Sequence, residues 1–524
     1  MGIVRKSRKI ESNSRKPMIK QKKKAKIREK YDKLSKTILE KVSEEINNSP
    51  MAKTTIRKIF ENALSMESEA IYNSKADYTY RANRSDPEAR QYLKEFILNK
   101  LYETDFSEEE VEEFIEVYPI NYFNGPKEIY TGTNTRFIAI ARKVMISLDD
   151  DYDIKLAKLA QMLYQDLYGA SLVDEFLYMG HTADGTKIEE IAVFGGHTVW
   201  FEVRGMKEKM DGIKFEKERI KQLVERFCIN SETENINSTN PQVNTTTYTN
   251  HRLSLRCAPY TAWYSFNLRL HYDNFITREF RIANGSTTEQ VETLFDYLMQ
   301  FKAKVLLVGG QGTGKTTMAR ALMENAPKNT VVGTVESSLE LNLKLIPNLI
   351  VEELQTIPGK SYDDALADLL RFGLDTMILG EIRTAEEVLT GMQVNQRQAN
   401  GGVSTYHADT AKTAIYSMRA LAMQTDIYKK ESLALFDVCR SYDIIIMLGA
   451  DKNGANATGE RYVSGIYEIP NVTEDATDVE PIPIFERDPA RKTLVKKNDI
   501  SPFLRGEFLR RNFDPELLEK MLNA

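Results

Sequence analysis

The chain has 524 residues, 42% of them hydrophobic and 28% charged, and a formal net charge of −5. Its length exceeds what one hydrophobic core usually organises, so we expect two or three domains. No run approaches the roughly 18 apolar residues of a membrane-spanning helix, and no signal peptide follows the basic start, which predicts a cytoplasmic product. Cys228, Cys257 and Cys439 form no CxxC pair, so neither a disulfide framework nor a structural zinc site is expected.

The start of the chain carries a strong positive charge. Residues 1–30 hold thirteen Lys or Arg and two Glu, a balance of +11 that leaves −16 for the rest of the chain. Two interpretations remain open, namely contact with anionic lipid or nucleic acid, and a solvated disordered tail. We expect residues 1–60 to form a basic, partly disordered tail and helix. Residues 61–150 are predicted to be a helical extension, in which Ser107 is placed to cap a helix.

Residues 151–285 mix helical periodicity with short alternating runs. The stretch "KLAKLAQMLYQDLYG" has helical spacing, whereas "IEEIAVFGGHTVWFEV" alternates as a β-hairpin does. This mixture predicts a small α/β domain. Within it, residues 230–250 are rich in Asn and Thr and poor in apolar side chains, which predicts a long exposed loop.

Residues 286–485 alternate apolar, β-branched runs with helical stretches. The runs are "KVLLVG", "TVVGTVE", "TMILGE", "GVSTYH" and "YDIIIMLG". Strands separated by helices indicate a mostly parallel sheet covered on both faces. Residues 486–524 are predicted to be a short helical appendage at the C-terminus.

The stretch "VLLVGGQGTGKTTMAR" contains the pattern G-x-x-x-x-G-K-[ST] at residues 309–316. An apolar strand precedes it and a helix-forming run follows it, which is the context that a phosphate-binding loop requires. Glycines let backbone N–H groups wrap a phosphate, Lys315 would reach the β- and γ-phosphates, and the Thr316 hydroxyl would ligate Mg²⁺. The predicted nucleotide-binding residues are Gly309, Gly310, Gln311, Gly312, Thr313, Gly314, Lys315, Thr316 and Thr317.

Hydrolysis also needs acidic and cationic groups at the phosphates. Glu381 ends the run "TMILGE", and we expect it to be the second Mg²⁺ ligand; Glu336 and Glu340 follow the run "TVVGTVE". His407 follows "GGVSTY" and is a candidate phosphate sensor. If the strands are parallel, all four side chains meet at the edge of the sheet that carries the phosphate loop.

These motifs, in this order, resemble those of the type II and type IV secretion traffic ATPases, which power pilus assembly, protein secretion and conjugation. The matching segments are "GGQGTGKTTMARAL", "VESSLEL", "LRFGLDTMILGEIR" and "GGVSTYHAD". The resemblance covers roughly residues 154–481. "RYVSGIYEI", which follows the motor core, resembles the Tad-pilus (CpaF-like) branch, and we favour that branch over the conjugation branch.

The resemblance implies a RecA-like P-loop ATPase motor domain, preceded by the smaller α/β domain, with ATP and Mg²⁺ as cofactors. It also implies a homo-hexameric ring at the cytoplasmic face of a membrane, acting on a platform protein embedded there. Arg252 and Arg256, in "HRLSLRCAPY", would act across a subunit interface, and residues 277–288 would be the hinge between the domains.

The sequence departs from the family's pattern at a few positions. Ser337 stands where an acid usually follows the first Glu, so Glu340 becomes a better candidate than Glu336 for orienting the attacking water. Leu374 replaces a usual proline, and Gln398 and Ala399 replace a Gly-His pair.

Two other functions remain open from the sequence. One is a DNA-stimulated translocase that binds nucleic acid through the basic tail, although direct nucleic-acid binding is not expected because the body is acidic and lacks a basic stripe interleaved with aromatic residues. The other is a nucleotide-binding scaffold without turnover, which the replaced motif residues would explain.

Overall fold

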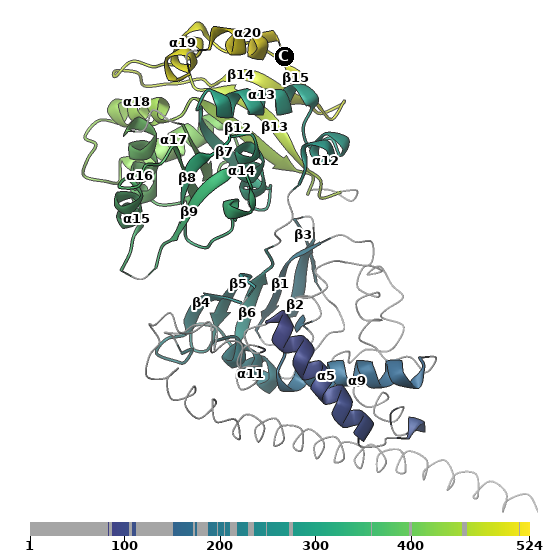
Figure 1. The fold of residues 1–524 in the computed structure, drawn as a ribbon. Coiled ribbons are helices and arrows are strands. Elements are labelled where there is room, and N and C mark those ends of the chain that lie inside the picture. The colour runs from purple at the N-terminus through teal and green to yellow at the C-terminus, as the bar shows by residue number, and fades with distance from the viewer. Residues whose placement is uncertain are drawn as a thin grey trace, which may run out of the picture. The chain divides into compact units, whose positions relative to one another are not determined.

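The computed structural model describes the chain from residue 82 onward, with gaps. The described residues are 82, 86–103, 107–109, 111, 150–170, 173–174, 187–195, 198–203, 205–209, 217–228, 235–247, 249–271, 276–357, 359–397, 401–452, 458–512 and 514–523. The predicted tail at residues 1–60 therefore lies outside the described residues. The chain divides into two compact units, Met1–His271 and Tyr272–Ala524 (Figure 1).

The first unit is built on a six-stranded sheet in which all neighbouring strands are antiparallel, in the order β3-β2-β1-β6-β5-β4. The strands are β1 (Ile188–Phe194), β2 (Thr198–Val203), β3 (Met206–Lys209), β4 (Gln242–Thr246), β5 (Arg252–Arg256) and β6 (Ser265–Arg269). The alternating pattern at residues 188–203 correctly predicted the hairpin of β1 and β2.

Three helices complete the described part of this unit. They are α5 (Pro87–Glu103), α9 (Tyr152–Leu167) and α11 (Lys217–Cys228). Helices α5 and α9 pack on each other through buried residues that include Leu93, Ile97 and Leu163. Helix α11 packs on β5 and β6, where the Phe227 and Phe266 rings meet edge to face at 5.4 Å. The helix expected after Ser107 lies mostly outside the described residues.

The segment predicted as one long loop, residues 230–250, contains β4. Its Val243 is fully buried and pairs with Leu255 of β5. Val243 is the one apolar residue of β4, so the strand shows no alternating pattern in the sequence. As an edge strand, β4 is stabilised by backbone pairing with β5 on one side. The exposed-loop prediction is therefore wrong for residues 242–246.

The second unit contains a nine-stranded sheet in the order β15-β14-β13-β12-β7-β11-β10-β8-β9. Strands β9, β8, β10, β11, β7 and β12 run parallel, and β13, β14 and β15 add to them antiparallel. The parallel strands are β7 (Lys304–Gly309), β8 (Thr330–Glu336), β9 (Leu349–Gln355), β10 (Thr376–Ile382), β11 (Gly402–Tyr406) and β12 (Ile444–Ala450). The predicted mostly parallel sheet is confirmed.

Helices cover both faces of this sheet. Val305 and Leu307 of β7 pack with α13 (Glu289–Gln300) and α14 (Lys315–Glu324) on one face. Leu306 and Val308 pack on the other face with α16 (Ala385–Arg397), α17 (Ala411–Ala422) and α18 (Glu431–Ser441). Helix α15 (Tyr362–Leu369) packs beside α16. Because successive strand residues point to opposite faces, an uninterrupted apolar strand needs both layers.

The C-terminal residues extend the core of the second unit. Strands β13 (Arg461–Glu468), β14 (Ile482–Asp488) and β15 (Thr493–Lys496) precede helices α19 (Pro502–Arg511) and α20 (Pro515–Asn523). Phe508 of α19 stacks on Phe301 at 5.4 Å, and α20 lies beside α13 (Figure 1). The segment expected to be only helical thus includes β15 and the end of β14, and its helices are part of the main hydrophobic core.

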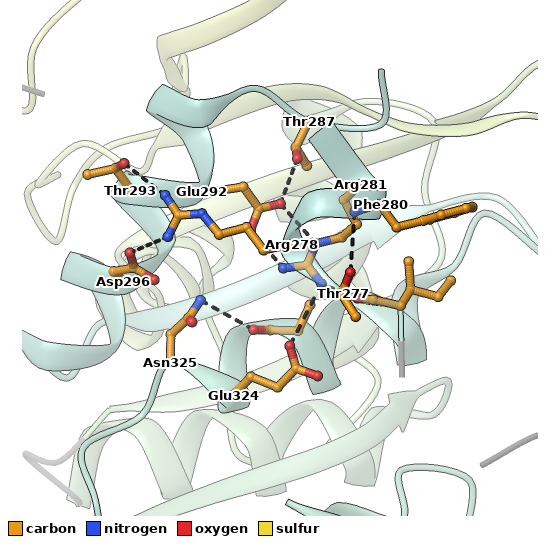
Figure 2. Close-up of polar contacts among 12 residues, drawn as sticks. Thr277, Arg278, Phe280, Arg281, Thr287, Glu292, Thr293, Asp296, Glu324 and Asn325 are labelled. Carbon is orange, nitrogen blue, oxygen red and sulfur yellow. Dashed lines mark hydrogen bonds and ion pairs between the residues drawn. The ribbon is translucent and has the colours of Figure 1, made fainter. Parts of the chain in front are cut away.

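The segment expected to be a hinge, residues 277–288, is held firmly to α13 (Figure 2). Thr277 caps the short helix α12 (Arg278–Ala283). From α12, Arg281 forms a two-bond ion pair with Glu292 of α13, with N···O distances of 2.9 and 2.7 Å. Glu292 is fully buried and also accepts a hydrogen bond from Thr287 at 2.6 Å. A hinge inside this segment would have to break a buried ion pair, which opposes the expectation.

The ion pair gives a testable expectation for stability. Replacing Glu292 with Gln removes the nearer counter-ion of the buried Arg281 and leaves only Glu324, whose Oε2 lies 3.8 Å from Nη1 of Arg281, which costs about 3 kcal/mol. The calorimetric midpoint of the intact chain should fall by roughly 6 °C or more. Asp296→Asn is the matched control, because Asp296 also joins α13 to α12. It pairs with Arg278 at 2.8 Å, but both side chains are about a third exposed. The control should cost under about 1 kcal/mol; equal losses in the two variants would contradict the expectation.

Candidate nucleotide-binding site

The predicted phosphate loop connects the end of β7 to the start of α14. Gly312 and Gly314 have φ of 67° and 91°, a left-handed conformation that favours glycine. A Cβ atom at Gly309 would stand 2.5 Å from the carbonyl oxygen of Leu448 in the neighbouring strand, so close packing also requires glycine there. Local geometry thus explains three glycines of the pattern, and the loop leaves its backbone exposed at the N-terminus of α14, which is where anions bind.

Lys315 is the first residue of α14, directly after the loop, and is 8% exposed. Its ammonium group donates to the carbonyl oxygens of Gly309 and Gly310, both at 3.0 Å. It also lies 3.2 Å from Nδ1 and 3.3 Å from Nε2 of His407. The positive charge is therefore held inside the loop, directly beside the predicted sensor.

The strand order brings the predicted residues to one edge of the sheet. Strand β11 lies between β7 and β10, and β8 is the next strand beyond β10. In this register His407 follows β11 and Glu381 lies near the end of β10. A Cβ atom at Gly380 would come within 2.8 Å of the Glu336 side chain, so Glu336 lies against the residue before Glu381. The shared carboxyl edge predicted from the sequence is what the structure has.

Glu381 is the centre of a charged cluster. Its Oε1 lies 2.5 Å from Nε2 of His407, and its Oε2 accepts a hydrogen bond from Arg383. Burial acts to raise the pKa of Glu381, but the hydrogen bonds from His407 and Arg383 outweigh it and lower the pKa to about 2. Glu381 is therefore ionised at neutral pH. If neutral His407 donates from Nε2 to Glu381, its Nδ1 is the acceptor for Lys315.

Glu336 and Glu340 have different surroundings. Glu336 is 3% exposed, and its Oε2 accepts the backbone N–H groups of Glu340 and Leu341 at 2.9 and 3.0 Å. Burial raises the pKa of Glu336 to about 7, although those two N–H groups act to lower it. Glu340 is half-buried. Glu336 thus holds the backbone of Glu340, the residue that the sequence analysis favoured for orienting the attacking water.

Four cationic residues that the sequence analysis did not assign also contact this region. Arg383 pairs with Glu381, and Arg320 donates to the carbonyl oxygen of Glu340 at 2.5 Å. Lys452 and Arg461 donate to the loop carbonyls of Gln311 and Gly312. Arg383 lies within "GEIR" and was visible beside Glu381. No local pattern marks Lys452 or Arg461, because only the pairing of β12 with β7 brings their hairpin to the loop.

Arg252 and Arg256 lie at the two ends of β5 in the first unit. With Ser254 they occupy one face of the strand, half-buried, while Leu253 and Leu255 are buried on the other. Any role of these arginines at the phosphates stays a prediction. Gln398 and Ala399 lie outside the described residues.

The residues expected to bind Mg²⁺ suit that ion chemically. The Thr316 hydroxyl and the ionised Glu381 carboxylate are hard oxygen donors, and Mg²⁺ uses few protein ligands together with water and phosphate oxygens. Among the described residues there is no cluster of three or more His, Cys, Asp or Glu side chains placed to hold a metal ion. An ion here would thus depend on the nucleotide's oxygens as well.

A strand, a glycine-rich loop and a helix in a parallel α/β sheet define a P-loop domain. Residues 196–448 match the protein family described as "Type II/IV secretion system protein". The chain therefore carries the domain of that family, which is the family that the four motifs resemble. In the described part of the chain no helix is both long and apolar enough to cross a membrane.

Two curated proteins are among the relatives. The chain is 22% identical to a probable conjugal transfer protein TrbB of Sinorhizobium fredii, over 42% of this chain and 67% of that protein. It is 23% identical to the type IV secretion system protein VirB11 of Bartonella quintana, over 28% of this chain and 42% of that protein. The chain thus spans less than half of the length of this second relative. The expected closeness to the Tad-pilus branch stays a prediction.

A solved structure of the ATPase DotB from Yersinia pseudotuberculosis also resembles the chain. It is 12% identical, and the match covers 64% of this chain and 81% of that one with a TM-score of 0.41. A TM-score below 0.5 does not establish a common fold. We therefore assign the fold from the strand order and the strand register of this chain alone.

The raised pKa of Glu336 predicts how stability depends on pH. The folded protein holds this proton more tightly than the unfolded chain does, so stability should fall as pH rises from about 4.5 to about 7. Between pH 5 and pH 8 the loss should be about 2 kcal/mol. Glu336→Gln should remove this part of the slope in denaturant unfolding, whereas Glu340→Gln, which leaves Glu336 in place, should keep it. An unchanged slope in Glu336→Gln would show that another group titrates.

Proposed function

We propose that the chain is an ATP-hydrolysing motor of a type II or type IV secretion, pilus-assembly or conjugation machine. The observation that carries the proposal is the position of Lys315, which lies within 3.3 Å of both ring nitrogens of His407 while His407 is paired with Glu381. A phosphate loop with its lysine and an ionised acid at one sheet edge are groups that phosphoryl transfer uses, and His407 contacts both the lysine and the acid. The family match to residues 196–448 supports the same function.

Each residue at this edge has a distinct task in the proposed mechanism. Backbone N–H groups of the loop and the Lys315 ammonium bind the β- and γ-phosphates, and Lys315 exchanges its loop carbonyls for phosphate oxygens. Thr316 and Glu381 would hold Mg²⁺, and the ion would supply positive charge against the negative charge that develops on the phosphate oxygens. Glu340 orients the attacking water, and Glu336 fixes Glu340 by accepting its backbone N–H. His407 responds to the γ-phosphate, because it contacts both Lys315 and Glu381.

The proposed assembly is a ring of identical subunits, with the second unit as a RecA-like motor domain. Arg252 and Arg256 of a neighbouring subunit complete each ATP site. Two arginines on one face of β5, with leucines buried on the other, form a rigid donor pair suited to phosphate oxygens. ATP and ADP differ in their contacts with such arginines, which is the difference that can drive a conformational change.

In the proposed location the ring lies at the cytoplasmic face of a membrane and works on an embedded platform protein. Relatives whose names contain "conjugal transfer" and "type IV secretion system" support a machine of this class. The thirteen Lys or Arg among residues 1–30 would add contact with anionic lipid.

Replacing Lys315 with Ala should abolish ATP turnover, because the γ-phosphate loses its only loop cation in the proposed mechanism. Steady-state phosphate release by the intact chain measures this. Lys328→Ala is the matched control, since Lys328 is an exposed lysine just before β8, at the opposite edge of the same sheet. The control should retain wild-type turnover. Turnover that persists in Lys315→Ala would refute the motor function.

The completion of each site by a neighbour can be tested by mixing inactive variants. Lys315→Ala and Arg256→Ala should each be inactive alone. The first variant lacks the lysine of the subunit that binds ATP, and the second lacks the arginine that the neighbouring subunit contributes to the same site. Mixed in equal amounts under conditions that exchange subunits, they should recover activity at roughly a quarter of the sites, because a head-to-tail ring then forms some intact interfaces. A mixture as inactive as its components would place Arg256 outside the neighbour's site.

A further inference from the structure

Two cationic side chains from one hairpin hold the tip of the phosphate loop. Lys452 follows β12 and donates to the carbonyl oxygen of Gln311 at 2.7 Å. Arg461 begins β13 and donates from Nε to the carbonyl oxygen of Gly312 at 2.8 Å. The stem of Arg461 also lies over Gly314, since its Cδ is 3.4 Å from where a Cβ of Gly314 would be. Both residues thus act on the loop's backbone and touch its outer side.

These contacts fix the direction of the N–H groups in the loop. In a planar trans peptide the C=O and the following N–H point in opposite directions. When Lys452 and Arg461 hold the carbonyls of Gln311 and Gly312, the N–H groups of Gly312 and Thr313 face away from the two cations. Loop N–H groups are the donors that bind phosphate, and glycines alone would let them rotate freely.

Arg461 is itself fixed from the side away from the loop. Its carbonyl oxygen accepts the hydroxyl of Ser286 at 2.7 Å, and Val463 donates its N–H to the carbonyl oxygen of Ser286 at 2.9 Å. Ser286 precedes Thr287, whose hydroxyl donates to the buried Glu292. The hairpin is therefore anchored in the same rigid segment that includes the Arg281–Glu292 ion pair, and it presents Arg461 to the loop from a fixed base.

We propose that Arg461, assisted by Lys452, is a positioning residue that pre-organises the phosphate loop for nucleotide. This inference rests on the proposed nucleotide binding, and it adds a residue outside the four motifs. Arg461 acts through the peptide groups of the loop and needs no contact with the nucleotide. A loop already in its binding conformation loses less conformational entropy on binding, so its effect is on affinity before chemistry.

The test compares two arginines of neighbouring strands in the intact chain. Arg461→Ala should weaken binding of a fluorescent ATP analogue about tenfold, equivalent to about 1.4 kcal/mol. It should raise KM by a similar factor while kcat changes less. Arg461→Lys should recover part of the affinity, because an ammonium group can still donate to Gly312.

Arg487→Ala is the matched control. Arg487 of β14 donates to the carbonyl oxygen of Gly285 at 3.0 Å and lies 4.2 Å from the centre of the Tyr462 ring, so it supports the same hairpin through groups outside the loop. Arg487→Ala should lower the thermal midpoint at least as much as Arg461→Ala and leave the affinity for the analogue at the wild-type value.

Three results would overturn the inference. Equal losses of affinity in Arg461→Ala and Arg487→Ala would mean that hairpin stability alone matters. Binding that is lost in Lys315→Ala but kept in Arg461→Ala would refute the positioning role and leave the proposed function standing. A wild-type chain that does not bind the analogue would refute both.

Discussion

The site depends on the parallel pairing of β7, β11, β10 and β8. Because these strands run in one direction, their carboxyl ends reach one edge of the sheet and bring together the phosphate loop, His407, Glu381 and Glu336. Their side chains along the strands are mostly apolar on both faces and are covered by helices. Polar chemistry is thereby confined to the edges, which is the general position of ligand sites in open α/β sheets.

At this edge the half-buried Glu381 and the buried Glu336 have opposite electrostatic surroundings. Cationic and hydrogen-bonding partners keep Glu381 ionised, with its pKa lowered to about 2. The Oε2 of Glu336 accepts the backbone N–H groups of Glu340 and Leu341, and burial raises the pKa of Glu336 to about 7. Environments that separate the pKa values of nearby acids also separate their tasks. A permanently charged acid suits an ion, whereas one that titrates near neutrality suits a structural or proton-exchanging position.

The sequence predicted the parts of this site that are local. Each of these parts has a sequence signature within about ten residues: the phosphate loop, the parallel strands, and the acids at the strand ends. The sheet edge that carries the site could therefore be predicted before the strand order was known. The clamp by Lys452 and Arg461 could not, because it depends on β12 pairing with β7 across more than a hundred residues. Strand β4 and the rigid residues 277–288 were also missed, since edge pairing and one buried ion pair have no periodic pattern.

The rigidity of residues 277–288 constrains where a nucleotide-driven change can act. The loop is tied to Arg461, Arg461 to Ser286, and the next residue, Thr287, to the buried Glu292 and Arg281 pair. Breaking the buried Arg281–Glu292 pair would cost several kcal/mol. Residues 277–288 are therefore part of the rigid second unit, and the proposed motor is not expected to bend inside this segment. In the proposed motor, the contacts of Lys452 and Arg461 would thus connect the phosphate loop to this rigid segment.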